Sequence, residues 1–147
     1  MSIELRNPEL EDKDRCRQLL AALSSTTEAS PGLPIRDSFE KLLEKGRGEI
    51  IVAVEDATIL GMATVSYNLA MRYGGEYCQL EELIVAPEAR GRNIGGLLVQ
   101  RTIDNARTRG CADYGLYLVE TTEHNRPFYE KYGFIAVGTE MRQSLID

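Results

Sequence analysis

The stretch from Glu81 to Gly96 constrains the fold of this chain more than any other. It opens with the apolar run Leu83-Ile84-Val85, passes through Pro87 into a loop rich in glycine and arginine, and ends as the first turn of an amphipathic helix. The unpaired amides and the dipole of a helix N-terminus both favour an anion there. Arg90 and Arg92 add positive charge to the same loop. We therefore expect an anion-binding strand, loop and helix at the centre of an α/β fold.

Composition narrows the class of protein and its partners. The 147 residues, 43% hydrophobic and 27% charged, are typical of one globular domain covering 1–147. A net charge of −6 disfavours general nucleic-acid binding, which needs a basic surface. No apolar run is long enough to span a membrane, and the N-terminal residues lack the apolar core of a signal peptide. We expect neither a nucleic acid nor a membrane as partner.

The cysteines and the single histidine bear on cofactors and compartment. Cys16, Cys78 and Cys111 are three in number and widely spaced, which favours reduced thiols and a cytoplasmic location over a disulfide framework. His124 is the only histidine and no Cys-x-x-Cys occurs, so we expect no metal site. A metal-dependent hydrolase and a Ser-His-Asp enzyme are both disfavoured.

The hydrophobic pattern predicts alternating strands and helices. Three strands joined by short turns should form an antiparallel meander in the middle of the chain, with Gly61 at a bulge. The whole order is β-α-α-β-β-β-α-β-α-β-β, a mixed α/β domain. The expected strands cover 3–6, 49–55, 59–69, 77–85, 114–119, 134–137 and 141–145. The first expected helix begins near Pro8, and the other three cover 38–44, 94–109 and 125–132.

The loop itself matches neither common phosphate-binding motif. No Gly-Lys-Ser/Thr follows, so it is not a Walker loop, and it is not a Gly-x-Gly-x-x-Gly fingerprint. Its glycines let the backbone approach an anion, and Asn93 tolerates a positive φ almost as well as glycine. The alternative is a solvated basic loop whose glycines serve only for turning.

The stretch from Val85 to Gly95 closely resembles the acetyl-coenzyme-A loop of the GNAT-type N-acetyltransferase superfamily. That pattern is Gln/Arg-x-x-Gly-x-Gly/Ala after a strand that ends in valine. Arg90 and Gly95 match its first and last positions, and Asn93 stands where a glycine is usual. The resemblance implies that the loop amides bind the coenzyme pyrophosphate and that the preceding strand holds the pantetheine arm. The residues concerned are Leu83, Ile84, Val85, Arg90, Gly91, Arg92, Asn93, Ile94, Gly95 and Gly96.

A second segment, from Asn125 to Phe134, resembles the late block of the same family, Asn-x-x-Phe-Tyr-x-Lys-x-Gly-Phe. In the family this block packs along the pantetheine arm, which implies coenzyme contacts for Asn125, Phe128 and Tyr129. The Tyr129 phenol would also lie near the coenzyme sulfur and protonate the leaving thiolate. The alternative is an amphipathic helix with aromatic core residues, and we favour that reading for Phe128, Tyr132 and Phe134.

Glu81 and Glu82 are the candidates for the base. Adjacent strand residues point to opposite faces, so Glu81 should share a face with Leu83 and Glu82 with Ile84. In the family, carboxylates at this point bind a cationic substrate or take its proton. We favour Glu81 as base, with a lesser role for Glu82. The alternative is that at least one of them is a structural carboxylate, at a dimer contact for example.

Residues of the turn before this strand are weaker candidates. Tyr67, Tyr73, Glu76 and Tyr77 either line an acceptor pocket or pack the hairpin, and packing is the more common case. Arg72 is a candidate for binding an acidic group of the substrate.

The resemblance implies a GNAT fold, with a mixed, mostly antiparallel central sheet and flanking helices. The sheet should splay between the strand ending at Val85 and the strand near 114–119. The implied activity is transfer of the acetyl group of acetyl-CoA, a cosubstrate, to a primary amine of a small molecule. We expect direct attack in a ternary complex, since neither motif contains a cysteine nucleophile. The alternatives are a protein acetyltransferase and a non-catalytic acyl-CoA sensor. Relatives often dimerise, so a homodimer is possible.

Overall fold

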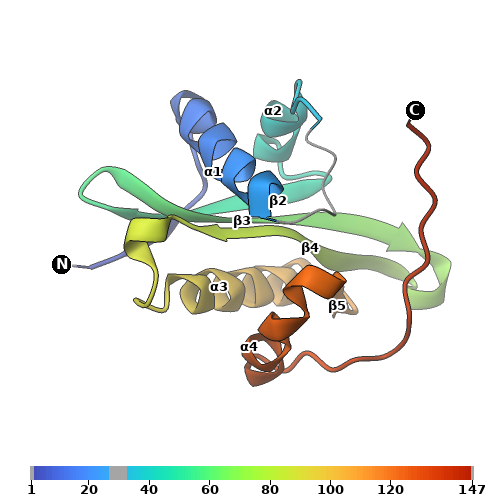
Figure 1. The fold of residues 1–147 in the computed structure, drawn as a ribbon. Coiled ribbons are helices and arrows are strands. Elements are labelled where there is room, and N and C mark those ends of the chain that lie inside the picture. The colour runs from blue at the N-terminus through green and yellow to red at the C-terminus, as the bar shows by residue number, and fades with distance from the viewer. Residues whose placement is uncertain (1, 27–32, 147) are drawn as a thin grey trace.

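The computed structural model describes residues 2–26 and 33–146, with side chains from 23 to 26 left aside. Five strands form one sheet in the order β1-β2-β3-β4-β5. Helices α1 and α2 cover one face of this sheet, and α3 and α4 lie on the other (Figure 1). The strands are β1 (Glu4–Arg6), β2 (Gly48–Glu55), β3 (Thr58–Ala70), β4 (Gly75–Val85) and β5 (Tyr114–Gly115), and the helices are α1 (Lys13–Thr26), α2 (Ser38–Leu43), α3 (Ile94–Arg109) and α4 (Arg126–Lys131).

Short 3-10 turns join several of these elements: η1 (Leu10–Asp12), η2 (Met71–Tyr73), η3 (Pro87–Ala89) and η4 (Glu120–Asn125).

Strands β1 to β4 pair antiparallel in sequence order, which confirms the predicted meander. Asp56 and Ala57 close the β2–β3 hairpin with φ of 50° and 64°, as a tight two-residue turn requires. The expected bulge also forms, since the register of β2 and β3 shifts beside Gly61.

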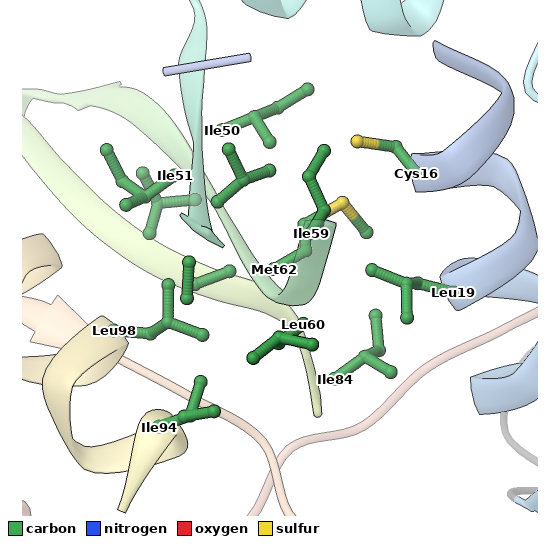
Figure 2. Close-up of a cluster of buried hydrophobic side chains, with 14 of the residues drawn as sticks. Cys16, Leu19, Ile50, Ile51, Ile59, Leu60, Met62, Ile84, Ile94 and Leu98 are labelled. Atoms are coloured by element: carbon green, nitrogen blue, oxygen red, sulfur yellow. The ribbon is translucent and has the colours of Figure 1, made fainter. Parts of the chain in front are cut away.

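The core lies on both faces of the sheet. Cys16 and Leu19 of α1 project toward it from one side, and Ile94 and Leu98 of α3 from the other (Figure 2). All four are at most 4% exposed. Strand β2 is buried at seven of its eight positions, as expected of a central strand covered on both faces. Part of the expected loop after α1 lies at 27–32, outside the described residues.

The sheet splays beside β4. Strand β5 is parallel to β4 and pairs with it only at Cys78–Tyr114 and Gln79–Gly115. The expected strand at 114–119 therefore ends early, because the chain leaves β4 after Gly115. From Leu80 to Val85, the edge of β4 that faces away from β3 has no strand partner within the described chain. The predicted splay is thus confirmed, and it exposes the backbone of the segment expected to hold the coenzyme.

The two closing strands expected at 134–137 and 141–145 do not form. Residues 134–146 run as an extended trace along one end of the molecule (Figure 1), without a ladder to any described strand. The alternating pattern that predicted strands is present, but a strand also needs an edge to pair with. Within one copy of the described chain, no such edge reaches this segment.

Candidate functional site

The loop that follows β4 has the predicted backbone. Its chain passes through η3 and enters α3 at Ile94, with Gly91 at φ 83° and Asn93 at φ 60° and ψ 25°. Asn93 thus adopts the left-handed conformation expected of it. The amide of Leu97 is bonded to the carbonyl oxygen of Asn93 at 3.1 Å. The amides of the first turn, at Ile94 to Gly96, have no intrahelical acceptor and point out of the helix. The geometry can therefore receive an anion.

The two glycines of this turn serve different purposes. A Cβ on Gly96 would collide with the hydroxyl of Tyr132 and the side-chain oxygen of Asn93. A Cβ on Gly95 would meet only ordinary contacts, 3.7 Å from both Phe128 and Val85. A side chain at Gly96 would therefore have to displace Tyr132 and Asn93, whereas a methyl group at Gly95 would fit in contact with Phe128 and Val85 beside the end of β4.

The two loop arginines differ in availability. Arg92 donates to both carboxylate oxygens of Glu55, at 3.1 and 2.6 Å, and this pair holds the pKa of Glu55 below its ordinary value. The side chain of Arg90 is exposed and makes no hydrogen bond or ion pair within the described chain. Arg90 is thus the loop cation that remains free for an anionic ligand.

The end of β4 combines an open backbone edge with two different side-chain environments. Ile84 is 7% exposed and belongs to the core cluster with α1, so only its backbone is available (Figure 2). Leu83 and Val85 approach Gly95 on the α3 face of the sheet. The structure therefore brings the three strand residues and the loop together, as the sequence predicted.

Glu81 and Glu82 lie on the same face of the sheet, contrary to the expectation from simple alternation. Strand β4 has a bulge here, because Thr64 is opposite Glu82 while Val65 is opposite Leu80. Glu81 is the extra residue. The hydroxyl of Ser66 donates to Glu81 at 2.6 Å, and the hydroxyl of Thr64 donates to Glu82. Thr64 and Ser66 are two residues apart on β3, so both carboxylates reach one face.

The environments of the two carboxylates differ. Glu81 is exposed. Glu82 is largely desolvated, and burial is the main cause that raises its pKa above the ordinary value; the charge of Glu81 adds to the rise and the bond from Thr64 opposes it. A carboxylate with a raised pKa is the better proton acceptor, so the buried position of Glu82 makes it a candidate for that role.

Helix α4 presents Tyr129 to a cavity of about 960 Å³ that Gln79, Tyr114 and Arg72 also line. Asn125 takes the N-cap position, Pro127 the first turn, and Gly133 (φ 97°) follows the last turn, all as predicted. Burial raises the pKa of the Tyr129 phenol, so it stays protonated at neutral pH and can donate a proton.

The aromatic residues of the late block form one half-buried cluster. The ring of Phe128 packs edge-on against Tyr129 at 5.0 Å and lies 5.3 Å from Tyr132, and Tyr129 packs against Phe134 at 6.1 Å between centroids. Phe128, Tyr132 and Phe134 are thus packing residues around Tyr129. Phe128 also flanks the space beside Gly95.

Two candidates for an acceptor pocket have structural roles instead. The Tyr67 hydroxyl donates to Glu49 at 2.9 Å in the core, and Glu76 pairs with Arg109 at 2.8 Å. Arg72 differs from both. Its guanidinium lies 4.7 Å from the ring of Tyr73 and 5.2 Å from that of Tyr77, with no carboxylate partner among the described residues.

Thr64 and Ser66 belong to the site but were not predicted from the sequence. The available signal was their spacing: two hydroxyl residues at i and i+2 on the strand that precedes the acidic pair in one hairpin. Register would have placed them opposite Glu81 and Glu82. The bulge, which decides the face of both carboxylates, has no comparable signature in the sequence.

Comparison with known proteins gives a consistent result. A family model described as "Acetyltransferase (GNAT) family" matches residues 14–134. Glucosamine 6-phosphate N-acetyltransferase 1 of Oryza sativa subsp. japonica is 30% identical over 141 residues, covering 90% of this chain and 82% of the relative.

Solved structures agree with this match. An acetyltransferase of Trypanosoma brucei superposes with a TM-score of 0.79 at 28% identity, covering 98% of this chain and 100% of that one. A predicted acetyltransferase of Clostridium acetobutylicum, solved with acetyl-CoA, superposes at 0.80 with 17% identity and shares the fold, covering 98% and 97%.

Two features are absent from the part of the chain that the structure describes. Within 2–26 and 33–146, no group of three or more His, Cys, Asp or Glu side chains is arranged to hold a metal ion. Over the same residues, no helix combines the length and apolar character needed to cross a membrane.

Proposed function

Because the chain belongs to the acetyltransferase (GNAT) family, whose members use acetyl-CoA, we propose that it acetylates the primary amine of a phosphorylated amino sugar. The observation that carries this choice is the 30% identity, over 90% of the chain, to a protein named glucosamine 6-phosphate N-acetyltransferase. A second protein of that name, from Trypanosoma brucei brucei, is 28% identical over 99% of this chain.

The coenzyme would bind along the open edge of β4 and the N-terminus of α3. The amides from Gly91 to Gly96 would receive the pyrophosphate, with Arg90 as the added charge, and Leu83 to Val85 would bond the pantetheine arm through the backbone. The splayed sheet and the unpaired amides support this position. Asn125 and Phe128 would flank the arm from α4.

The proposed chemistry needs one proton acceptor and one donor. Glu82 takes the proton of the acceptor ammonium, directly or through water, and the amine nitrogen attacks the thioester carbonyl. A C–N bond forms, the C–S bond breaks, and Tyr129 gives its phenolic proton to the leaving thiolate. The second proton that the nitrogen loses as the amide forms passes through water to the Tyr129 phenolate, and Glu82 releases its proton to solvent. Glu81 holds the cationic amine near its entry. The raised pKa values of Glu82 and Tyr129 support these assignments.

Arg72 would bind the phosphate of the acceptor. It lines the same cavity as Tyr129 and stacks on two tyrosine rings, which orient the guanidinium without neutralising it. Guanidinium groups bind phosphate well because two N–H donors match two phosphate oxygens. This contact would distinguish amino sugar phosphates from amino sugars without a phosphate.

The working form would be a homodimer in which segment 135–146 of each copy pairs with the other copy. Ile135, Val137, Met141 and Leu145 occur at odd positions, share one side of an extended chain, and are 77% to 92% exposed. Strand β5 also keeps one unpaired edge in the described chain. Association between two copies would cover both the apolar side of this segment and the open edge of the sheet.

The experiment is a screen of amines with detection of thiol release and mass analysis of the product. Glucosamine 6-phosphate, glucosamine, polyamines and a peptide with a free N-terminus would be compared. We expect the highest kcat/KM for glucosamine 6-phosphate. Preference for the peptide would favour a protein acetyltransferase, and coenzyme binding without turnover would favour a sensor. The three unpaired cysteines fit a reducing cytoplasm, which we also propose.

A further inference from the structure

Strand β3 carries two hydroxyl groups aimed at the acidic pair of β4. Thr64 is directly opposite Glu82 and donates to its Oε1 atom. Ser66 donates to Glu81, and the side-chain amide of Asn68 in turn donates to the Ser66 hydroxyl at 3.0 Å. Each carboxylate of the pair therefore has its own hydroxyl partner on the neighbouring strand.

The two hydroxyl partners are not equivalent. Thr64 is 3% exposed and sits in a central strand covered on both faces, so its hydroxyl has a fixed direction. Ser66 binds a carboxylate that is exposed to solvent. A hydrogen bond from a rigid, buried donor orients its acceptor far more strictly than one at the surface, where water competes.

Among the described residues, one oxygen of Glu82 accepts a hydrogen bond. No described residue donates to its Oε2 atom, and that atom is not among the buried polar atoms without a partner. In the described part of the chain, the carboxylate is thus anchored at Oε1 and has no donor at Oε2. Such an arrangement leaves Oε2 available for a proton in a fixed orientation, because rotation of the carboxyl group is restrained by Thr64.

We propose that Thr64 is a positioning residue for Glu82: its hydroxyl holds the carboxylate so that Oε2 faces the acceptor amine. This inference rests on the proposed function, since it assumes that Glu82 accepts the proton. The charge that bears on Glu82 from its own strand is that of Glu81. The groups of β3 that face Glu82 are hydroxyls. The buried residues that α1 presents to the sheet are Cys16 and Leu19. Both are uncharged, because burial raises the pKa of the Cys16 thiol to about 11.

Thr64→Val keeps the side-chain shape and removes only the donor, whereas Thr64→Ser keeps the donor. We expect Thr64→Val to lower kcat at least tenfold, to leave KM for acetyl-CoA unchanged and to move the acidic limb of the pH profile to higher pH, because the lost bond stabilises the charged form. Thr64→Ser should keep most of the wild-type kcat and leave the acidic limb of the pH profile near its wild-type position. Thr108→Val, on the exposed side of α3, is the matched control.

A second readout does not depend on turnover. The Glu82 carboxyl can be titrated by ¹³C NMR in wild type, Thr64→Val and Thr64→Ser, with thermal unfolding confirming that each variant is folded. A higher midpoint in Thr64→Val alone supports the inference. An unshifted midpoint or an unchanged kcat overturns it even if the enzyme acetylates its acceptor. A shifted midpoint in a protein that acetylates no amine would show that the proposed function has failed while the Thr64–Glu82 contact stands.

Discussion

Arg92 binds both carboxylate oxygens of Glu55, at 3.1 and 2.6 Å, and this pair fixes the loop before α3 to the end of β2. Arg90, two residues earlier, has no such partner among the described residues. Arg90→Ala should therefore weaken coenzyme A binding by about tenfold, as expected for loss of a charged hydrogen bond of roughly 1.5 kcal/mol. Arg92→Ala should have a smaller effect on coenzyme A binding, since the Arg92 guanidinium is already paired with Glu55. Calorimetry at two salt concentrations measures the change in coenzyme A affinity for both variants. A larger loss for Arg92→Ala would contradict this assignment.

The glycines of the first turn of α3 give a second test. Gly96→Ala should destabilise the fold, because its Cβ would collide with Tyr132 and Asn93. Gly95→Ala should leave the free protein as stable or raise its stability by about 0.5 kcal/mol, as is usual when a helix glycine becomes alanine without strain, yet weaken coenzyme A binding by filling the space beside β4. Thermal unfolding with and without coenzyme A separates the two effects. If the two variants changed stability and coenzyme A binding by equal amounts, the proposed difference between Gly95 and Gly96 would be ruled out.

The raised pKa of Glu82 predicts how both the stability and the activity of the protein depend on pH. Its raised pKa means that the folded state binds the proton more tightly than the unfolded chain, so this residue disfavours folding above the raised pKa and less so as the pH falls through it. Glu82→Gln should thus be more stable than wild type at high pH, with the difference shrinking toward acid.

The same substitution should affect catalysis. Because the deprotonated form accepts the proton, kcat/KM of wild type should fall as the pH drops through the raised pKa. Glu82→Gln should lower kcat by roughly 10²- to 10⁴-fold and remove that limb, while Glu81→Gln should act mainly on KM for the acceptor. The reverse assignment, with Glu81 as base, predicts the opposite pattern.

Tyr129→Phe tests the proton donor. The hydroxyl is removed while the aromatic cluster with Phe128 and Phe134 is kept. We expect kcat to fall by roughly 10²-fold, the usual effect of a general acid, with an unchanged dissociation constant for coenzyme A. An acceptor assay combined with calorimetry makes this comparison. Full activity of the variant would exclude Tyr129 as the acid.

The extended segment after α4 predicts the oligomeric state. If Met141 is buried in both copies, at roughly 2 kcal/mol each, Met141→Glu should raise the dimer dissociation constant by about three orders of magnitude. Ser144→Glu lies on the alternate side of the segment and serves as the control. Analytical ultracentrifugation gives the constant directly. A wild-type protein that remains monomeric at high concentration would contradict the dimer.

The features that could be predicted from the sequence are those set by local chemistry. The meander follows from alternating apolar residues and short turns, and the loop follows from its glycines, Asn93 and the amphipathic helix that begins at Ile94. Helix α4 was bounded correctly because proline and glycine mark its two ends. In the candidate site, the same reasoning predicted the left-handed backbone at Asn93, whereas the roles of the loop and of Tyr129 stay predictions.

The errors share one cause, which is dependence on a neighbour. The strands expected at 134–137 and 141–145 have the right residues, but within the described chain this segment does not reach a free sheet edge. Strand β5 ends after Gly115 because the chain leaves β4, although the apolar pattern continues. The face of Glu81 was wrong because a single extra residue in β4 reverses the alternation. Pairing and register are properties of two segments, so one segment alone does not reveal them.

The central claim, direct transfer from acetyl-CoA to an amino sugar phosphate in a ternary complex, is tested most directly by rapid mixing. The enzyme, in excess over acetyl-CoA, is mixed with it either alone or together with glucosamine 6-phosphate, and free thiol and N-acetylated product are followed in time. We predict no thiol release without the acceptor, and equal amounts of thiol and product with it. A burst of thiol before the acceptor is added, or thiol release without an N-acetylated product, would contradict the account.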